Sequence, residues 1–217
     1  MSDDLVERLL KLDTCAVSDA LDRLGKTGVA LGIAPTSPPA KIAGRVITVK
    51  LKEQAPGEKS TRHLCTAAIE AAAGGEVIVI ENPRLDAAGW GGILSAAAKV
   101  KGVAGVIVDG AARDIDEARE LEFPVFARAA VPRTARGRVM EEDFNVPIKV
   151  AGFSVSPGDL VLADGSGVAF IAAAEAEEVL EAAEMIAARE AKMKEAVLNG
   201  DSVVEVMGRD YEQMLQR

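Results

Sequence analysis

Hydrophobic and polar positions follow two different patterns in the middle of the chain. Continuous apolar runs such as EVIVIE at 76–81 and AGVIVD at 104–109 are typical of strands buried on both faces, whereas the segments between and after them have helical spacing. Strands and helices are expected to alternate in this order: 76–81, 93–101, 104–109, 114–121 and 124–127. This βαβαβ order favours parallel pairing with right-handed crossovers.

The flanking segments have other patterns. Before the core we expect helices at 3–11 and 15–24, a half-buried strand at 42–52 and a helix at 61–73. After it we expect strands at 148–155, 160–163 and 168–172, joined by the turns SPGD at 156–159 and DGSG at 164–167, then a long helix at 175–198 and a tail at 203–215. The tail could pack on its own subunit or on a neighbour. The prediction is one α/β domain over 1–217, with a parallel βαβ core, an antiparallel hairpin layer and a long C-terminal helix.

Composition narrows the class of partner. Of the 217 residues 49% are hydrophobic but only 3% aromatic, which suits Ala-rich helices on a β-branched sheet and gives few platforms for stacking nucleic-acid bases. The formal charge of −9 would repel phosphate backbones and anionic membranes. One basic cluster, Arg128, Arg133, Arg136 and Arg138, is interpreted as a solvated loop or a subunit contact. We expect a protein with small-molecule or protein partners that binds neither nucleic acid nor membranes.

The two cysteines and the N-terminus indicate a compartment. Cys15 and Cys65 lack metal-ligand spacing, and the first residues form an acidic amphipathic pattern without a basic leader. No apolar run approaches the roughly 18 residues of a membrane span. Reduced thiols in the core and a cytoplasmic location are expected.

A Gly-Gly pair precedes the helix at 93–101. The first amides of that helix, at Ile93 and Leu94, have no acceptor within the helix and carry the positive end of its dipole. Gly91 and Gly92 would let a carboxylate or phosphate approach closely, so the residues expected to bind the substrate anion are Gly91, Gly92, Ile93 and Leu94. Gly-Gly before a helix is common, so this feature needs a partner.

That partner is the Arg113-Asp114 pair, which follows the strand at 104–109. Arg113 offers a fork of donors for a carboxylate or oxyanion, and Asp114 offers oxygen ligands for Mg²⁺. The alternative is that Asp114 only caps its helix and Arg113 is solvated. If 76–81 and 104–109 are neighbouring parallel strands, both loops open at one sheet edge, where α/β folds bind ligands. A catalytic pocket there is the preferred hypothesis.

These residues carry a family resemblance. GGILSAAAKVKGVAGVIVDGAARDIDE, PVFARAAVPRT and VPIKVAGFSVSPGDLVLADGSGVAFI resemble the family that joins 4-hydroxy-4-methyl-2-oxoglutarate aldolases, oxaloacetate decarboxylases and the regulator of ribonuclease E activity A. The likeness covers nearly the whole chain. It implies a swivelling β/β/α fold and a homotrimer, which could double to a hexamer, with sites at subunit boundaries.

The resemblance also implies residue roles. Asp114 would hold Mg²⁺ or Mn²⁺, with Glu117 three residues later, and Arg113 would bind the substrate and neutralise its enolate. The family's aldolases carry an Asp about twenty residues before the Arg, where this chain has Gly92. A further carboxylate is expected from a neighbouring subunit, and Glu190 is the candidate.

The implied function is a class II pyruvate lyase. Retro-aldol cleavage of a 4-hydroxy-2-oxo acid and decarboxylation of oxaloacetate both leave pyruvate enolate, which a metal and Arg113 would stabilise. The alternatives are a regulator that binds a ribonuclease E type enzyme, or a scaffold with a vestigial site. His63 is interpreted as structural or peripheral, and Lys99 and Lys101 as complements to a helix dipole. Groups that recognise the part of the substrate distal to pyruvate are expected on loops such as 55–60 and on the neighbouring chain.

Overall fold

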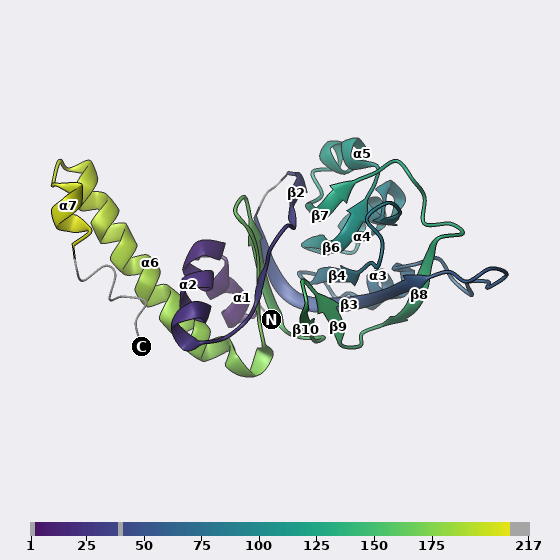
Figure 1. Ribbon diagram of the computed structural model, residues 1–217, viewed down its shortest axis with the longest axis horizontal. Helices are drawn as coiled ribbons and strands as arrows, with labels where there is room; N and C mark the ends of the chain where they lie inside the picture. The colour runs from purple at the N-terminus through teal and green to yellow at the C-terminus, as the bar shows by residue number, and fades with distance from the viewer. Residues whose placement is uncertain (1–2, 39–40, 209–217) are drawn as a thin grey trace.

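A ten-stranded mixed sheet organises the protein (Figure 1). The computed structural model describes residues 3–38 and 41–208. The strand order is β1-β12-β11-β3-β4-β6-β7-β2, with β5 paired to β6 and β8 paired to β3. The strands of this sheet are β1 (Val29–Ala30), β2 (Ala34–Ser37), β3 (Ile42–Glu53), β4 (Val77–Glu81), β5 (Ala88–Trp90), β6 (Gly105–Ala112), β7 (Val125–Ala130), β8 (Val139–Phe144), β11 (Leu160–Asp164) and β12 (Gly167–Ile171).

The centre of the sheet is parallel, as the apolar runs predict. β3, β4, β6 and β7 are parallel neighbours, with Ile78 of β4 opposite Ile47 of β3 and Val106 of β6. All of β4 except Glu81 is buried, because each face of the sheet is covered. The mixed α/β fold with a parallel core and a long C-terminal helix is therefore confirmed.

Helices and a small hairpin complete the chain. The helices are α1 (Asp4–Leu9), α2 (Thr14–Leu24), α3 (Thr66–Ala71), α4 (Gly92–Val100), α5 (Ile115–Glu120), α6 (Ala176–Leu198) and α7 (Val203–Val206), with a 3-10 turn at Ala173–Glu175. A separate two-stranded sheet joins β9 (Ile148–Val150) to β10 (Phe153–Val155).

Two predicted elements are wrong in their extent. The helix expected at 61–73 begins only at Thr66, because Cys65 has a φ of 65° and a backbone amide bound to Glu141. The strand expected at 148–155 is two strands, since Ala151 and Gly152 both have positive φ and form a tight turn. The turn at 164–167 between β11 and β12 is confirmed, with Asp164 accepting hydrogen bonds from Thr14 and Ser166.

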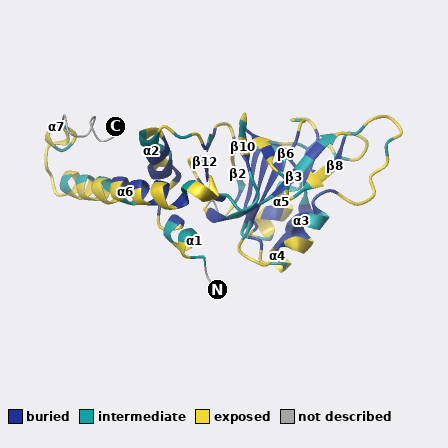
Figure 2. Ribbon diagram, turned by 90° about the horizontal axis from the view of Figure 1, so that it is seen from below, coloured by how far each residue is buried: buried dark blue, intermediate teal, exposed yellow. Residues whose placement is uncertain are grey.

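Three apolar clusters fix the layers. α3, α4 and α5 cover one face of the parallel strands, and Figure 2 shows them on one side of the sheet. The opposite face packs against residues of the β9-β10 hairpin. α1, α2 and the first half of α6 pack against β11 and β12.

The second half of α6 extends away from the sheet, on the side opposite α4 and α5 (Figure 1). α7 follows it, and the rest of the tail expected at 203–215 lies outside the described residues from 209 onward. Within the described ranges, no helix has both the length and the apolar composition needed to cross a bilayer.

Candidate functional site

Two turns leave the sheet side by side at the carboxyl ends of β5 and β6. The Gly-Gly pair follows β5, a short strand that the sequence pattern did not predict, and Arg113 follows β6 directly. The two strands run parallel with Trp90 opposite Ala112, and the Arg113 amide donates to the Trp90 carbonyl at 3.0 Å. The predicted convergence of the two loops is therefore present.

Asp114 turns its carboxylate toward the Gly-Gly pair. Its φ of 56° is a left-handed conformation, which Asp tolerates better than most residues. Among the described residues, the carboxylate caps no amide of its own helix α5. Instead Oδ2 accepts a hydrogen bond from the Gly92 amide at 3.0 Å and forms an ion pair with Arg113, whose Nε lies 3.2 Å away. The simple capping interpretation of Asp114 is thus wrong.

This contact corrects the role expected for Gly92. Its amide, one of the groups expected to hold the substrate carboxylate, is already bonded to Asp114. The amides of Ile93 and Leu94 remain at the start of α4, where the helix dipole attracts an anion. An anion at this helix end would therefore bind next to Asp114 and not in its place.

Two carboxylates pack against the glycines so closely that no side chain fits there while both carboxylates keep their positions. A Cβ atom on Gly91 would lie 2.8 Å from Asp114 Oδ2. A Cβ atom on Gly92 would lie 1.8 Å from Glu117 Oε2, far inside van der Waals contact. The Glu117 carboxylate consequently occupies the space that a side chain at position 92 would fill.

A cavity of about 260 Å³ opens above these groups. Its walls include the predicted residues Gly91, Gly92, Ile93, Leu94, Arg113, Asp114 and Glu117. The cavity also has lining residues that were not predicted for the site, among them His63, Leu64, Thr134 and Ala135. These four residues come from segments between elements that fold onto the sheet edge, and none of them has a predicted role in the site, although Thr134 ends the family-like segment PVFARAAVPRT. His63, set aside from its sequence context, lies in the wall of the pocket.

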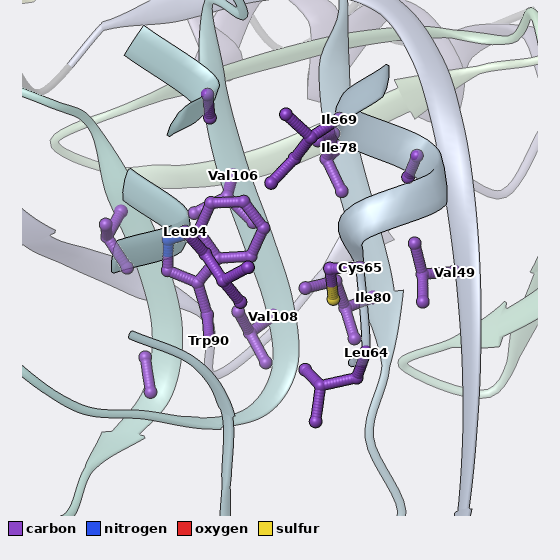
Figure 3. Packing of buried hydrophobic residues seen from close by; sticks show 14 of the residues in the cluster. Val49, Leu64, Cys65, Ile69, Ile78, Ile80, Trp90, Leu94, Val106 and Val108 are labelled. Carbon is purple, nitrogen blue, oxygen red and sulfur yellow. The ribbon is translucent and has the colours of Figure 1, made fainter. Parts of the chain in front are cut away.

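The floor of the cavity belongs to the hydrophobic core. Trp90 is 2% exposed, stacks on Phe123 with ring centroids 6.2 Å apart and donates from Nε1 to Ser95 Oγ at 2.8 Å. Figure 3 shows Trp90, Leu94 and Leu64 in one cluster with the core residues of β4 and β6. Because core packing holds its floor, the site is rigid where the glycines and Asp114 meet.

A buried carboxylate holds the wall that carries His63. Glu141 of β8 accepts from the Cys65 amide at 2.6 Å and from Arg62 Nε at 2.8 Å. The Arg62 guanidinium also lies 5.1 Å from the centre of the Phe144 ring. Burial, with a smaller contribution from Glu141, raises the pKa of the Cys65 thiol well above its usual value. Cys65 is therefore a core thiol, as predicted for both cysteines. That prediction is wrong for Cys15, which is exposed on α2.

Comparison with known proteins places this site in a family. A family model described as RraA-like, Aldolase/RraA, matches residues 14–170. The chain belongs to the RraA-like family. The match includes the Gly-Gly pair, Arg113, Asp114 and Glu117, but ends before α6.

Other RraA-like proteins resemble this one over different shares of their length. Protein DlpA of Legionella pneumophila is 31% identical over 96% of this chain, which spans only 34% of DlpA. A 4-hydroxy-4-methyl-2-oxoglutarate aldolase of Thermus thermophilus is 35% identical over 59% of this chain and 74% of its own length. The crystal structure of an uncharacterized protein from Pseudomonas syringae superimposes with a TM-score of 0.85 at 30% identity, covering 96% of this chain and 98% of that one.

The donor groups of this RraA-like site suit a divalent cation. Over the described ranges, no three His, Cys, Asp or Glu side chains gather into a metal cage. Asp114 and Glu117 nevertheless meet at Gly92, and Mg²⁺ is commonly held by one or two carboxylates with water and substrate as the other ligands. The residues present therefore fit such an ion.

Glu190 does not join this site within one chain. It lies on α6, which extends away from α4 and α5, and it lines a separate groove with Met193 and Val197 (Figure 1). Burial, with the neighbouring Asp19 and Asp13, raises the pKa of its carboxyl group. Its participation through a neighbouring subunit stays a prediction.

Proposed function

We propose that this protein is a divalent-metal-dependent lyase that releases pyruvate, by retro-aldol cleavage of a 4-hydroxy-2-oxo acid, by decarboxylation of oxaloacetate, or by both. The observation that carries the proposal is the convergence of Asp114 and Glu117 on Gly92, with Arg113 beside them. The family membership and the aldolase name of the Thermus relative support it.

The pyruvate half of the substrate would bind at the start of α4. Its carboxylate would accept from the amides of Ile93 and Leu94, which lie at the positive end of the helix dipole. The Arg113 side chain is 39% exposed and lines the cavity, so its guanidinium can donate to the keto oxygen at C2. The contact with Arg113 strengthens as that oxygen gains negative charge.

Asp114 and Glu117 would hold a Mg²⁺ or Mn²⁺ ion. Such an ion, when bound, would act as a Lewis acid on the carboxylate and keto oxygens of the substrate. Arg113 Nε pairs with Asp114 Oδ2, so the guanidinium is aligned with the carboxylate before substrate arrives. Fixed charges of this kind stabilise a transition state without reorganisation.

The two reactions share one intermediate. In cleavage, the bond between C3 and C4 breaks, its electron pair enters the enolate of pyruvate, and the C4 hydroxyl loses its proton to become a carbonyl. In decarboxylation, the bond from C3 to the departing CO₂ breaks and leaves the same enolate. Protonation of C3 then gives pyruvate in both cases.

We also infer that the projecting arm formed by α6 and α7 packs against another copy of the chain. Leu198 is 76% exposed and Val204 79% exposed on this arm. The resemblance that implies a homotrimer or a hexamer supports this inference. Size-exclusion chromatography with light scattering tests it, and a monomer at micromolar concentration would contradict it.

The test of the lyase is pyruvate release from oxaloacetate and from 4-hydroxy-4-methyl-2-oxoglutarate, with Mg²⁺ and with a chelator. Blanks without enzyme are needed because Mg²⁺ alone promotes oxaloacetate decarboxylation. Asp114→Asn should abolish the metal-dependent rate, whereas Asp116→Asn should not, because Asp116 is 91% exposed and pairs with Arg119 outside the cavity. Arg113→Ala should lower the turnover by about 10²–10³, as removal of an oxyanion donor does. Equal rates with and without the chelator would refute the proposal.

A further inference from the structure

A second, larger cavity adjoins the first. It has a volume of about 660 Å³ and is formed by the loop that joins β3 to α3 and by residues 134–140. In Figure 1 this loop projects beyond the sheet on the side away from α6. Five residues line both cavities: His63, Leu64, Arg113, Thr134 and Ala135. A substrate that binds Arg113 in the first cavity therefore has the second cavity directly beside it.

The two walls of this distal cavity are fastened to each other by Gln54. Its side-chain oxygen accepts from the Gly137 amide at 3.1 Å, and its Nε2 donates to the Glu58 carbonyl at 2.6 Å. Its own amide donates to the Arg138 carbonyl at 2.9 Å. The cavity is therefore a built feature, because one residue ties the loop after β3 to the segment before β8.

The distal cavity has unpaired positive charge. Lys59 and Arg136 line it, and in the part of the chain that the structure describes neither side chain has an ion-pair partner. Glu58 also lines it, but a hydrogen bond from Lys52 lowers the pKa of this carboxyl, and the pair is 2.7 Å apart. Arg62 also lines the cavity, but its guanidinium forms a hydrogen-bonded ion pair with Glu141. Two free cations facing one cavity stand out on a chain of net charge −9.

We propose that the distal cavity binds a terminal anion on the leaving half of the substrate, so that the preferred substrate is a 4-hydroxy-2-oxo acid with a carboxylate or phosphate beyond C5. This inference rests on the proposed lyase function. Cavities of roughly 300–1,000 Å³ hold drug-sized ligands, and a four- or five-carbon acid is far smaller than these. The first cavity, of about 260 Å³, can therefore hold such an acid without help from the second. The larger, cationic cavity then has no part in binding the substrate unless the substrate extends into it.

The chemistry of the longer substrate is balanced in the same way. Cleavage breaks the bond between C3 and C4, its electron pair passes to pyruvate enolate, and the C4 hydroxyl releases its proton to solvent as the leaving half departs as an aldehyde that carries the anion. C3 of the enolate then takes up a proton to give pyruvate. In the reverse direction, C3 of the enolate attacks the aldehyde carbon and the new alkoxide takes up a proton. No oxidant or further reactant is needed.

The experiment uses the reverse direction, with pyruvate, Mg²⁺ and aldehydes in matched pairs. Glyceraldehyde 3-phosphate is compared with glyceraldehyde, and succinic semialdehyde with butanal. For the wild-type protein, kcat/KM should be about tenfold or more higher for at least one anionic aldehyde than for its neutral partner, which corresponds to one charge-assisted hydrogen bond. Which pair shows the preference distinguishes a phosphate from a carboxylate.

Two variants locate the effect. Arg136→Gln should reduce the ratio of anionic to neutral aldehyde toward one, and because the ratio is taken within each variant, a general loss of active protein cancels. Arg133→Gln is the matched control, since Arg133 is on the same segment but pairs with Asp86 and lines neither cavity. It should keep the wild-type ratio.

A separate measurement distinguishes failure of this inference from failure of the lyase. Exchange of the pyruvate methyl protons for deuterium, followed by NMR without any aldehyde, reports enolate formation alone. Exchange with a ratio near one for both aldehyde pairs would overturn the distal site and leave the lyase standing. Absence of Mg²⁺-dependent exchange would overturn both.

Discussion

Gly92→Ala is the substitution that most directly tests the arrangement of carboxylates. The new Cβ atom would lie 1.8 Å from Glu117 Oε2 and 2.7 Å from its Cδ, so the Glu117 carboxylate must leave its position. The obstacle is the end of a flexible side chain on the exposed side of α5 and not a backbone atom. Asp114 Cβ would lie 3.3 Å from the new atom, so Asp114 has to give by only a few tenths of an ångström.

The expected effects on stability and on activity have opposite signs. Gly92 is the first residue of α4 and its φ is not positive, so Ala should stabilise the folded state by up to about 1 kcal/mol, the usual difference in helix propensity. Loss of Glu117 from the site should weaken Mg²⁺ binding or activity by about 10–100-fold, the range typical for displaced groups around a metal. Few substitutions separate the two properties in this way.

The assay measures pyruvate release as a function of Mg²⁺ concentration, together with the midpoint of urea unfolding. Gly165→Ala serves as the control, because its Cβ atom would meet no atom within 4 Å and its φ is not positive. A Gly92→Ala protein with wild-type turnover and wild-type half-saturation by Mg²⁺ would refute the idea that the position of Glu117 matters. A large loss of stability would refute the claim that only the side chain must move.

A double variant extends the test. Gly92→Asp alone places a second carboxylate against Glu117, and Glu117→Ala alone removes one. Combined, the two substitutions return the number of carboxylates to that of the wild type, so the double variant should be more active than the product of the single effects implies. Additive losses would mean that the two positions do not share one function.

Two further predictions concern the support of the site. Glu141→Ala should lower the free energy of unfolding by about 2 kcal/mol, because it removes the charge-assisted hydrogen bond from the buried Cys65 amide. Glu142→Ala should cost less than about 1 kcal/mol, because its ion pair with Lys50 is exposed. Urea titrations of both variants measure the two differences. A thiol reagent near pH 8 should modify only Cys15 in the native protein and both cysteines after denaturation, since burial excludes the reagent from Cys65 and raises the pKa of its thiol. Rapid modification of both native thiols would contradict the packing described.

The parallel core was predictable because its signal is local. A strand that is buried on both faces must be apolar at every position, and β4 and β6 are recognisable for that reason without knowledge of their partners. The start of α3 was not predictable in this way. The Cys65 amide donates to the Glu141 carboxylate, 76 residues away in sequence. This long-range bond holds Cys65 outside the helix, so α3 begins at Thr66 and not at residue 61 as the helical spacing predicts.

The residues of the site likewise fall into those that local sequence predicts and those that it does not. Arg113 and Asp114 follow a recognisable strand, and the turn after a buried parallel strand is where ligand groups gather. His63 and Thr134 reach the same cavity from segments whose position depends on Glu141 and on the loops around Gln54. Contacts between residues so distant in sequence leave no periodic pattern for a single sequence to show.

Gly92 shows how a residue type can mislead when its surroundings are unknown. Taken alone, the glycine reads as a missing carboxylate and raises the possibility of a vestigial site. In the fold, Asp114 adopts a left-handed conformation and α5 begins at once, so that Glu117, three residues on, projects from the same side of the helix toward Gly92. The space left by the absent side chain is filled by another carboxylate, and the small residue is a condition for that arrangement. A side chain at position 92 and Glu117 in its present place exclude each other, so the two positions are best understood as one.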